Sequence, residues 1–133
     1  MPQVGVDRRA PDLHGLSGYE LLGAIVGSRK WWVRSLRPAS RGIWLFGSAA
    51  RGEAGPASDI DLLLESKFNH EELQALGARL GTMVGRTIHL VDSAALRDHS
   101  DRYFYLRFER DAYCLHGVLG RSWPSLLTPP REL

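Results

Sequence analysis

The most informative part of this chain is residues 45–62, which read LFGSAARGEAGPASDIDL. The apolar run at residues 43–46 leads into it and is typical of a buried strand. Gly47 ends that run, and residues 49–52 suit a short helix. After a Gly-Pro loop, residues 60–64 are apolar again. The pattern predicts two strands joined by a turn, a short helix and a loop.

Two carboxylates lie close together at the start of the second predicted strand. Asp59 and Asp61 are two residues apart, so both side chains point to one face, separated by about 6.6 to 6.8 Å along the strand. Two carboxylates on a buried sheet face repel each other and are costly to desolvate. Oxygen ligands at this spacing suit Mg²⁺ or Mn²⁺, with substrate phosphates completing the shell. Alone, such a pair is better explained as two acids that reach solvent.

The turn at Gly47 and Ser48 favours the metal interpretation. A turn that leaves a buried strand and opens a helix gathers free N–H groups, which attract anions. Gly47 allows a phosphate to approach the backbone, Ser48 adds a hydroxyl donor, and Arg51 lies one turn further on. Ser48 as a helix cap and Arg51 as a solvated side chain are the simpler alternatives. A phosphate cradle beside a carboxylate pair is the arrangement that phosphoryl or nucleotidyl transfer needs.

The whole stretch resembles the signature of the nucleotidyltransferases of the DNA polymerase beta superfamily. Their motif is Gly-Ser, about ten residues, then Asp-x-Asp, and here residues 49–58 separate Ser48 from Asp59. With the Arg-Asp-Ala-Tyr-Cys-Leu segment at 110–115, the resemblance extends over residues 17–118. This part of the chain is similar to the minimal, single-domain members of the superfamily. It implies Asp59 and Asp61 as metal ligands and catalytic residues, and Gly47, Ser48 and Arg51 as the nucleotide and phosphate site.

The resemblance also implies a cofactor, a donor and a partner. The cofactor would be Mg²⁺ or Mn²⁺, and the donor a nucleoside triphosphate such as ATP. Minimal members are commonly encoded beside a HEPN ribonuclease toxin, and several act as its antitoxin by binding it or by adding AMP to it.

One position departs from the family pattern. The third family strand usually carries an aspartate as third metal ligand and base, whereas this chain has His89 within Ile88-His89-Leu90-Val91. A neutral imidazole accepts a proton and binds Mn²⁺, but it is a poor ligand for Mg²⁺. Asp92 falls on the opposite strand face and is more simply a helix cap. His89 is therefore a candidate catalytic residue, and one that puts full turnover in question.

The remaining pattern predicts an α/β (α+β) domain, with helices packed on a small mixed β-sheet. Ser17 and Glu20 form a capping box for one helix that ends before Pro38. Asn69 caps a helix to about Leu80, residues 87–91 form a strand, a helix runs from Ser100 to about Asp111, and residues 113–115 form a last strand. We expect a flexible N-terminal arm over 1–16, the nucleotidyltransferase domain over 17–118, and an irregular tail over 119–133.

Composition bounds the possible classes of protein. The chain has 133 residues, a net charge of +2 and one cysteine, which rules out an internal disulfide. Its apolar runs are far shorter than a membrane span, and its charge is not that of a dedicated nucleic-acid binder. We expect a cytoplasmic protein that binds neither membrane nor DNA directly and that could form a homo-oligomer.

Three further features have simple structural interpretations. Five basic residues and no acid lie between Arg29 and Arg41, which suits a solvated face or, alternatively, a surface for an acidic partner or RNA phosphate. Of Trp31 and Trp32, one would be core and the other an interface anchor. Cys114 is most simply a small buried apolar residue.

Three functions follow from these observations. The first is a metal-dependent transferase that moves a nucleoside monophosphate, AMP from ATP, to a hydroxyl of a protein partner. The second, favoured by His89, is a weakened or inactive antitoxin that neutralises a HEPN toxin by binding. The third is transfer to a small molecule such as an aminoglycoside, for which this chain lacks a second domain.

Overall fold

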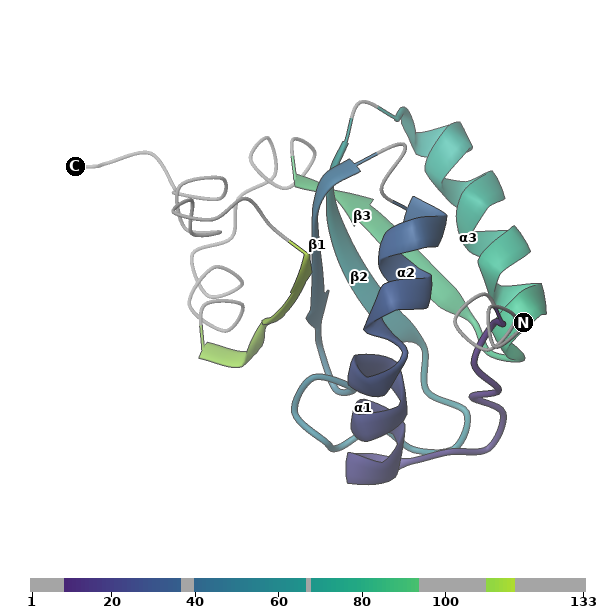
Figure 1. Cartoon of the computed structure of the whole chain (residues 1–133), viewed down its shortest axis with the longest axis vertical. Helices are drawn as coiled ribbons and strands as arrows, with labels where there is room; N and C mark the ends of the chain where they lie inside the picture. The colour runs from purple at the N-terminus through teal and green to yellow at the C-terminus, as the bar shows by residue number, and fades with distance from the viewer. Residues whose placement is uncertain (1–8, 37–39, 67, 94–109, 117–133) are drawn as a thin grey trace, which may run out of the picture.

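The computed structural model describes residues 9–36, 40–66, 68–93 and 110–116, and it contains one mixed sheet with helices on one face (Figure 1). Its elements in chain order are α1 (Gly18–Gly27), α2 (Arg29–Leu36), β1 (Ser40–Phe46), β2 (Ile60–Ser66), α3 (His70–Val84), β3 (Ile88–Asp92) and β4 (Tyr113–His116). The helix predicted from Ser100 lies outside the described residues except at its end.

The sheet has the strand order β3-β2-β1-β4. β1 is antiparallel to both β2 and β4, whereas β2 and β3 run parallel and are connected through α3. A parallel pair needs such a crossover, and a helix is its usual form. The predicted fold class, a small mixed sheet with helices packed on it, is confirmed.

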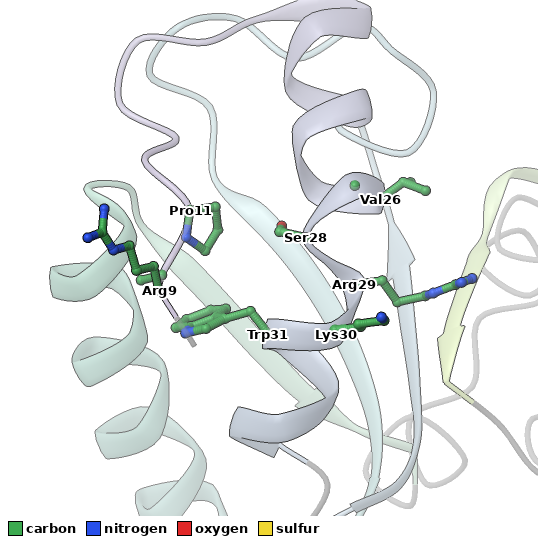
Figure 2. A pocket seen from close by; sticks show the side chains of 9 residues that line it. Arg9, Pro11, Val26, Ser28, Arg29, Lys30 and Trp31 are labelled. Carbon is green, nitrogen blue, oxygen red and sulfur yellow. The ribbon is translucent and has the colours of Figure 1, made fainter. Parts of the chain in front are cut away.

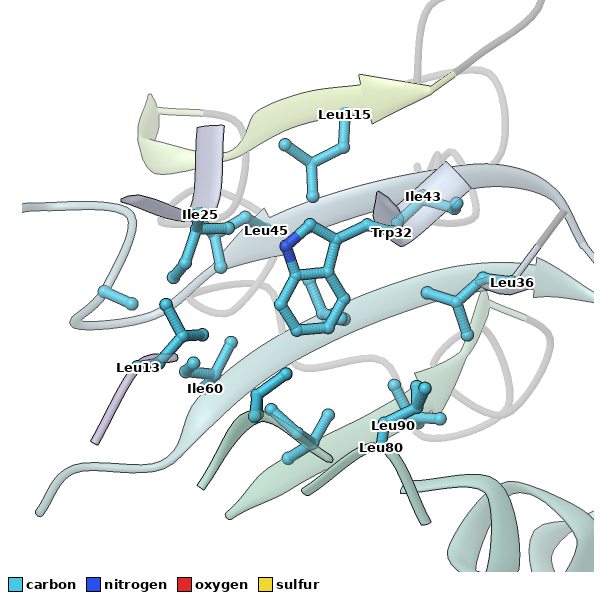
Figure 3. Close-up of a cluster of buried hydrophobic side chains, with 14 of the residues drawn as sticks. Leu13, Ile25, Trp32, Leu36, Ile43, Leu45, Ile60, Leu80, Leu90 and Leu115 are labelled. Carbon is cyan, nitrogen blue, oxygen red and sulfur yellow. The ribbon is translucent and has the colours of Figure 1, made fainter. Parts of the chain in front are cut away.

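The hydrophobic core lies between the three helices and one face of the sheet. Alternate residues of each strand point to that face, which puts Ile43 and Leu45 of β1 against the helices. Figure 3 shows the fully buried indole of Trp32 among core side chains from the helices and strands. The side chains of Asp61 and His89 lie on the opposite face of the sheet.

The predicted first helix is two helices. It breaks at Ser28, whose backbone N–H and hydroxyl both bond to the carbonyl of Ala24. The hydroxyl of Ser28 also accepts a hydrogen bond of 3.1 Å from the indole of Trp32. The break lets α2 turn its tryptophans inward, and both Trp31 and Trp32 are buried, in an edge-to-face pair. The expectation that one of them is an exposed interface anchor is wrong.

The capping prediction is confirmed for α3 and wrong for α1. Asn69 forms a complete capping box with Glu72, as its position indicated. Ser17 precedes α1 but makes no side-chain capping bond, so the box predicted with Glu20 is wrong. α3 also runs past the predicted end, to Val84, and Gly85 ends it in the left-handed conformation.

The expectation of a flexible arm over 1–16 fails for part of that segment. Leu13 is fully buried in the core, and its backbone N–H bonds to Val84. An apolar side chain shielded from water in this way holds the chain before α1 in place. The bounds of the arm, the domain and the tail remain predictions.

Two other expectations concern Cys114 and Asp92. Cys114 is exposed on β4, so its interpretation as a buried residue is wrong. Asp92 is the last residue of β3, and its carboxylate accepts hydrogen bonds from the backbone and hydroxyl of Ser66.

No helix within the described residues is long and apolar enough to cross a membrane.

Candidate nucleotidyl-transfer site

The predicted site residues come together where β1 ends and β2 begins. Gly47 follows directly after β1, and Asp61 is the second residue of β2. In the sheet, Asp61 is paired with Phe46 on one side and with His89 on the other. The register therefore places the Gly47 turn, the acidic motif and His89 side by side.

Gly47 and Asp61 lie close together in this site. Gly47 has a φ of 77°, and a Cβ atom at this position would lie 2.6 Å from Oδ2 of Asp61. Such a distance is far below van der Waals contact, so the carboxylate occupies the space that any other residue would need. Gly47 thus serves two purposes, because it permits both the turn and the close approach of Asp61.

The segment after Gly47 is a hydrogen-bonded turn and not the predicted short helix. The carbonyl of Gly47 accepts bonds from the backbone of Ala50 and Arg51, and that of Ser48 accepts one from Glu53. Within the described residues the hydroxyl of Ser48 has no hydrogen-bond partner. It is therefore available to donate to a ligand, as the phosphate-cradle hypothesis requires.

Asp61 and His89 form the central polar pair. Nδ1 of His89 lies 3.2 Å from Oδ1 of Asp61, and the imidazole is 62% exposed. Burial raises the pKa of the Asp61 carboxyl, the bond and charge of His89 lower it, and the negative charge of Asp59 raises it further. The balance of these effects is a raised pKa, so the ionised form of Asp61 is costly in the protein by itself.

Asp59 lies one residue before β2 and is exposed. The sequence placed it on the strand, whereas the strand begins at Ile60, whose N–H bonds to Thr87. Its charge acts on both Asp61 and Arg86, so it stands near both. The two acids of the motif are consequently close enough to sense each other.

Arg51 is directed toward acids of its own chain. Its guanidinium bonds to Glu53 at 2.9 Å and to Asp111 at 3.5 Å, and the first of these interactions does most to raise its pKa. A phosphate would have to compete with these carboxylates. The structure thus gives Arg51 a role in joining the turn to the segment before β4.

Arg86 is the residue that sequence reasoning missed. It is only 8% exposed, and its guanidinium donates to the carbonyls of Ser58, Gly55, Leu13 and Leu16. Burial lowers its pKa, and the charge of Asp59 opposes that shift. An arginine between a helix and a strand carries no local signal of such a role. In the structure it clamps the loop that precedes Asp59 to the segment before α1.

The metal hypothesis can be tested against these donors. Within the described residues no three His, Cys, Asp or Glu side chains are grouped as a metal site. Asp59 and Asp61 offer carboxylate oxygens at one edge, and Mg²⁺ is commonly held by one or two carboxylates plus substrate phosphates. A cation would also relieve the mutual repulsion and desolvation that raise the pKa of Asp61. The donor set fits a divalent cation that arrives with a nucleotide.

Comparison with known proteins agrees with this geometry. The chain belongs to the nucleotidyltransferase domain family, whose model matches residues 32–112 and so includes every predicted site residue. No curated protein sequence matches the chain.

Solved structures share the fold at low sequence identity. A chain of a toxin–antitoxin structure with AMP-PNP superposes with a TM-score of 0.58 at 21% identity, over 68% of this chain and 74% of that one. A chain of the toxin–antitoxin MntA–HepT gives 0.51 at 19% identity, over 68% and 70%. A structure from Shewanella oneidensis gives 0.50 at 13% identity, over 71% of both chains. The fold is that of the polymerase-beta-like nucleotidyltransferases.

Proposed function

We propose that this protein is a metal-dependent nucleotidyltransferase that moves AMP from ATP to a hydroxyl group of a protein partner. The observation that carries the proposal is the convergence of Gly47, Asp61 and His89 at the edge of β1 and β2. The partner we propose is a HEPN-type toxin, with this chain as its cytoplasmic antitoxin.

The comparisons support the donor and the partner. One structure with this fold is described as a toxin–antitoxin with AMP-PNP, an analogue of ATP. Another is described as the toxin–antitoxin MntA–HepT. Both descriptions concern other proteins, and the proposal extends them to this chain through the shared fold and the family motif.

The side chains of this protein would bind and orient the donor. Ser48, at the start of the turn after Gly47, would donate its hydroxyl to a phosphate of the nucleotide. Asp59 and Asp61 would hold a divalent cation through their carboxylate oxygens. When bound, that cation would neutralise charge on the phosphates and polarise the α-phosphorus.

His89 would act on the acceptor. If its Nδ1–H donates to Asp61, its exposed Nε2 is free to accept a proton. In the proposed step, the acceptor oxygen bonds to the α-phosphorus while the bond to pyrophosphate breaks. Pyrophosphate leaves, and the hydroxyl proton passes to Nε2. The bond to Asp61 sets both the tautomer and the orientation of the ring.

A second function is favoured by the same contact. A histidine bonded to Asp61 uses an oxygen that a metal would otherwise take, and imidazole is a poor Mg²⁺ ligand. In that case the chain would neutralise its toxin by binding alone. We retain this as the alternative, because the contact is consistent with a weakened site.

The deciding experiment incubates the protein with ATP labelled at the α-phosphate, with Mg²⁺ or Mn²⁺, and with or without the protein encoded beside it. The proposal predicts label on the partner, and none with the Asp61→Asn variant. A wild type silent with either metal that still binds and inhibits the partner would leave the alternative function. If the partner is neither labelled nor bound, both functions fail.

A further inference from the structure

The guanidinium of Arg86 bonds to two segments that are far apart in the chain. On one side it donates to the carbonyls of Leu13, at 3.1 Å, and Leu16, which both precede α1. On the other side it donates to the carbonyls of Ser58, at 2.8 Å, and Gly55, in the loop that leads into β2. One side chain thereby connects the segment before α1 to the loop that precedes the acidic motif.

This arginine is buried without an ion pair. It is 8% exposed, and within the described part of the chain its guanidinium forms no salt bridge. Burial lowers the pKa of the Arg86 guanidinium, since a charge is costly to remove from water. The four carbonyls offset that cost, and they would themselves lose a buried donor without the arginine. The guanidinium and the two segments therefore depend on each other.

The segment before α1, residues 9–16, has few other attachments. Leu13 is fully buried, and its N–H bonds to the carbonyl of Val84 at 2.9 Å. Upstream, Pro11 and Trp31 of α2 line the same cavity of about 470 Å³ (Figure 2). Because this cavity leaves space beside the upstream part of the segment, Leu13 and the bonds to the guanidinium provide much of its attachment.

The loop on the other side of the guanidinium leads directly to a motif acid. The carbonyl of Ser58 is bonded to Arg86, and its hydroxyl accepts a further bond of 2.8 Å from the loop backbone. Asp59 is the next residue, and Ile60 then begins β2 with its N–H bonded to Thr87. Within the described residues the carboxylate of Asp59 makes no hydrogen bond or ion pair. The position of this carboxylate therefore depends on the backbone on either side of it.

We infer that Arg86 is a positioning residue of the transfer site, through which the segment before α1 sets the position of Asp59. The inference rests on the proposed function, in which Asp59 holds a divalent cation. Displacement of Leu13 would remove two of the four acceptors of the guanidinium and would loosen its hold on the loop.

Electrostatics alone predicts the opposite effect of losing this arginine. The charges of Arg86 and Asp59 act on each other, so the guanidinium weakens the attraction of a cation to the carboxylate. Removal of that charge would by itself strengthen metal binding. Loss of a positioning contact would weaken it, because residues that orient a metal ligand commonly change metal affinity by about 10- to 100-fold. The direction of the change therefore separates the two roles.

The test uses the full chain, with Mn²⁺ and Mn²⁺ plus AMP-PNP as probes. Binding is measured from paramagnetic broadening of the amide signals at the start of β2, at a temperature where every variant is folded. Arg86→Gln removes the charge, and Leu13→Ala loosens the segment before α1. The matched controls are Arg79→Gln, on the exposed face of α3, and Leu36→Ala, at the end of α2 and as buried as Leu13 (Figure 3). Hydrogen exchange of residues 55–59 is recorded without metal.

We expect Arg86→Gln and Leu13→Ala to weaken Mn²⁺ binding about tenfold and to speed up exchange of residues 55–59. Neither control should change either quantity. If Arg86→Gln does not fold, Arg86→Lys replaces it with the same expected direction, because lysine keeps the charge but lacks the planar fork of donors.

Two results would overturn the inference. One is tighter Mn²⁺ binding in Arg86→Gln, which would leave only a charge effect. The other is unchanged exchange of residues 55–59 in Leu13→Ala, which would show that the segment before α1 does not act on the loop. A wild type that binds Mn²⁺ under neither condition would contradict the proposed function, and the exchange of the loop in Leu13→Ala would then decide the inference by itself.

Discussion

Oδ2 of Asp61 occupies the position next to Gly47 where a side chain would begin, 2.6 Å from a Cβ atom built on that glycine. Two motif residues fourteen positions apart in the chain are therefore so close that a side chain on the first would overlap the carboxylate of the second. The glycine of the Gly-Ser turn shapes the phosphate side of the site and also sets the position of a carboxylate on the metal side. Changes at either residue should affect both.

The first prediction concerns this contact. Gly47→Ala should lower the free energy of unfolding by about 1 to 2 kcal/mol, because φ is positive there, and should displace Asp61. Gly23→Ala is the matched control, since that glycine has open space within α1 and alanine favours helix. Denaturant unfolding and a labelled-ATP transfer assay measure the two effects. Equal behaviour of both variants would contradict the steric role of Gly47.

The second prediction concerns Asp61. Its folded-state pKa is raised, so the protein gains stability from this group at low pH and loses that gain as pH rises through the raised value. At neutral pH, Asp61→Asn removes a costly charge and should leave thermal stability unchanged or slightly higher. Transfer should be abolished, because a carboxylate ligand is lost. Unfolding scans at two pH values, together with the transfer assay, test this. Wild-type rates in the variant would remove Asp61 from the mechanism.

The third prediction concerns His89. Replacing it with aspartate would put a further carboxylate beside Asp61, with which it is paired in register. His89→Asp should therefore raise Mg²⁺-supported transfer relative to Mn²⁺-supported transfer, because oxygen ligands suit Mg²⁺. It should also increase the stabilisation by Mg²⁺ in a melting experiment, a readout independent of turnover. His89→Ala serves as control, since it removes the imidazole without adding a ligand. No gain in Mg²⁺ stabilisation over this control would refute the idea.

The fourth prediction concerns Ser48, whose hydroxyl has no partner among the described residues. Ser48→Ala should weaken ATP binding or transfer by about 1.5 to 3 kcal/mol, the value of one charge-assisted hydrogen bond. Protein stability should change little, because no described bond of the folded protein is lost. Calorimetric titration with a non-hydrolysable ATP analogue measures the affinity. An unchanged affinity and rate would leave the hydroxyl without a function in the site.

The fifth prediction concerns the buried clamp at Arg86. Arg86→Met should reduce the free energy of unfolding by roughly 2 to 4 kcal/mol, because several buried carbonyls lose their donor. The free energy of unfolding of Arg86→Lys should lie between those of the wild type and Arg86→Met, since an ammonium group can donate to some of these carbonyls. The exposed Arg79→Met is the control. Hydrogen exchange should also speed up in the loop before Asp59, and unchanged exchange there would argue against a positioning role.

Local sequence signals were sufficient for the elements that carry the site. The apolar runs predicted β1, β2 and β3, and Asn69 with Glu72 predicted the start of α3. These signals work because a buried strand needs continuous apolar residues, and a helix start needs an acceptor for its free N–H groups. The spacing from Ser48 to Asp59 likewise indicated the family that the domain match shows.

Local signals of this kind gave wrong predictions where contacts between separate parts of the chain decide the structure. The first helix breaks at Ser28, and this break lets both tryptophans reach the core. The stabilisation gained by burying them depends on contacts with other elements, so no short window of sequence indicates it. Ser17 has the residue type of a cap but makes no capping bond. Leu13 belongs to a polar segment and is nonetheless buried against the end of α3.

The sequence by itself therefore determined the chemical groups of the site, the order of the strands along the chain and the family. Their arrangement was decided by tertiary structure. Strand register places Asp61 between Gly47 and His89, and buried hydrogen bonds make Arg86 the clamp of the loop before Asp59. Register and burial arise from contacts between residues far apart in the chain, whose energies depend on the whole fold and not on neighbouring residues.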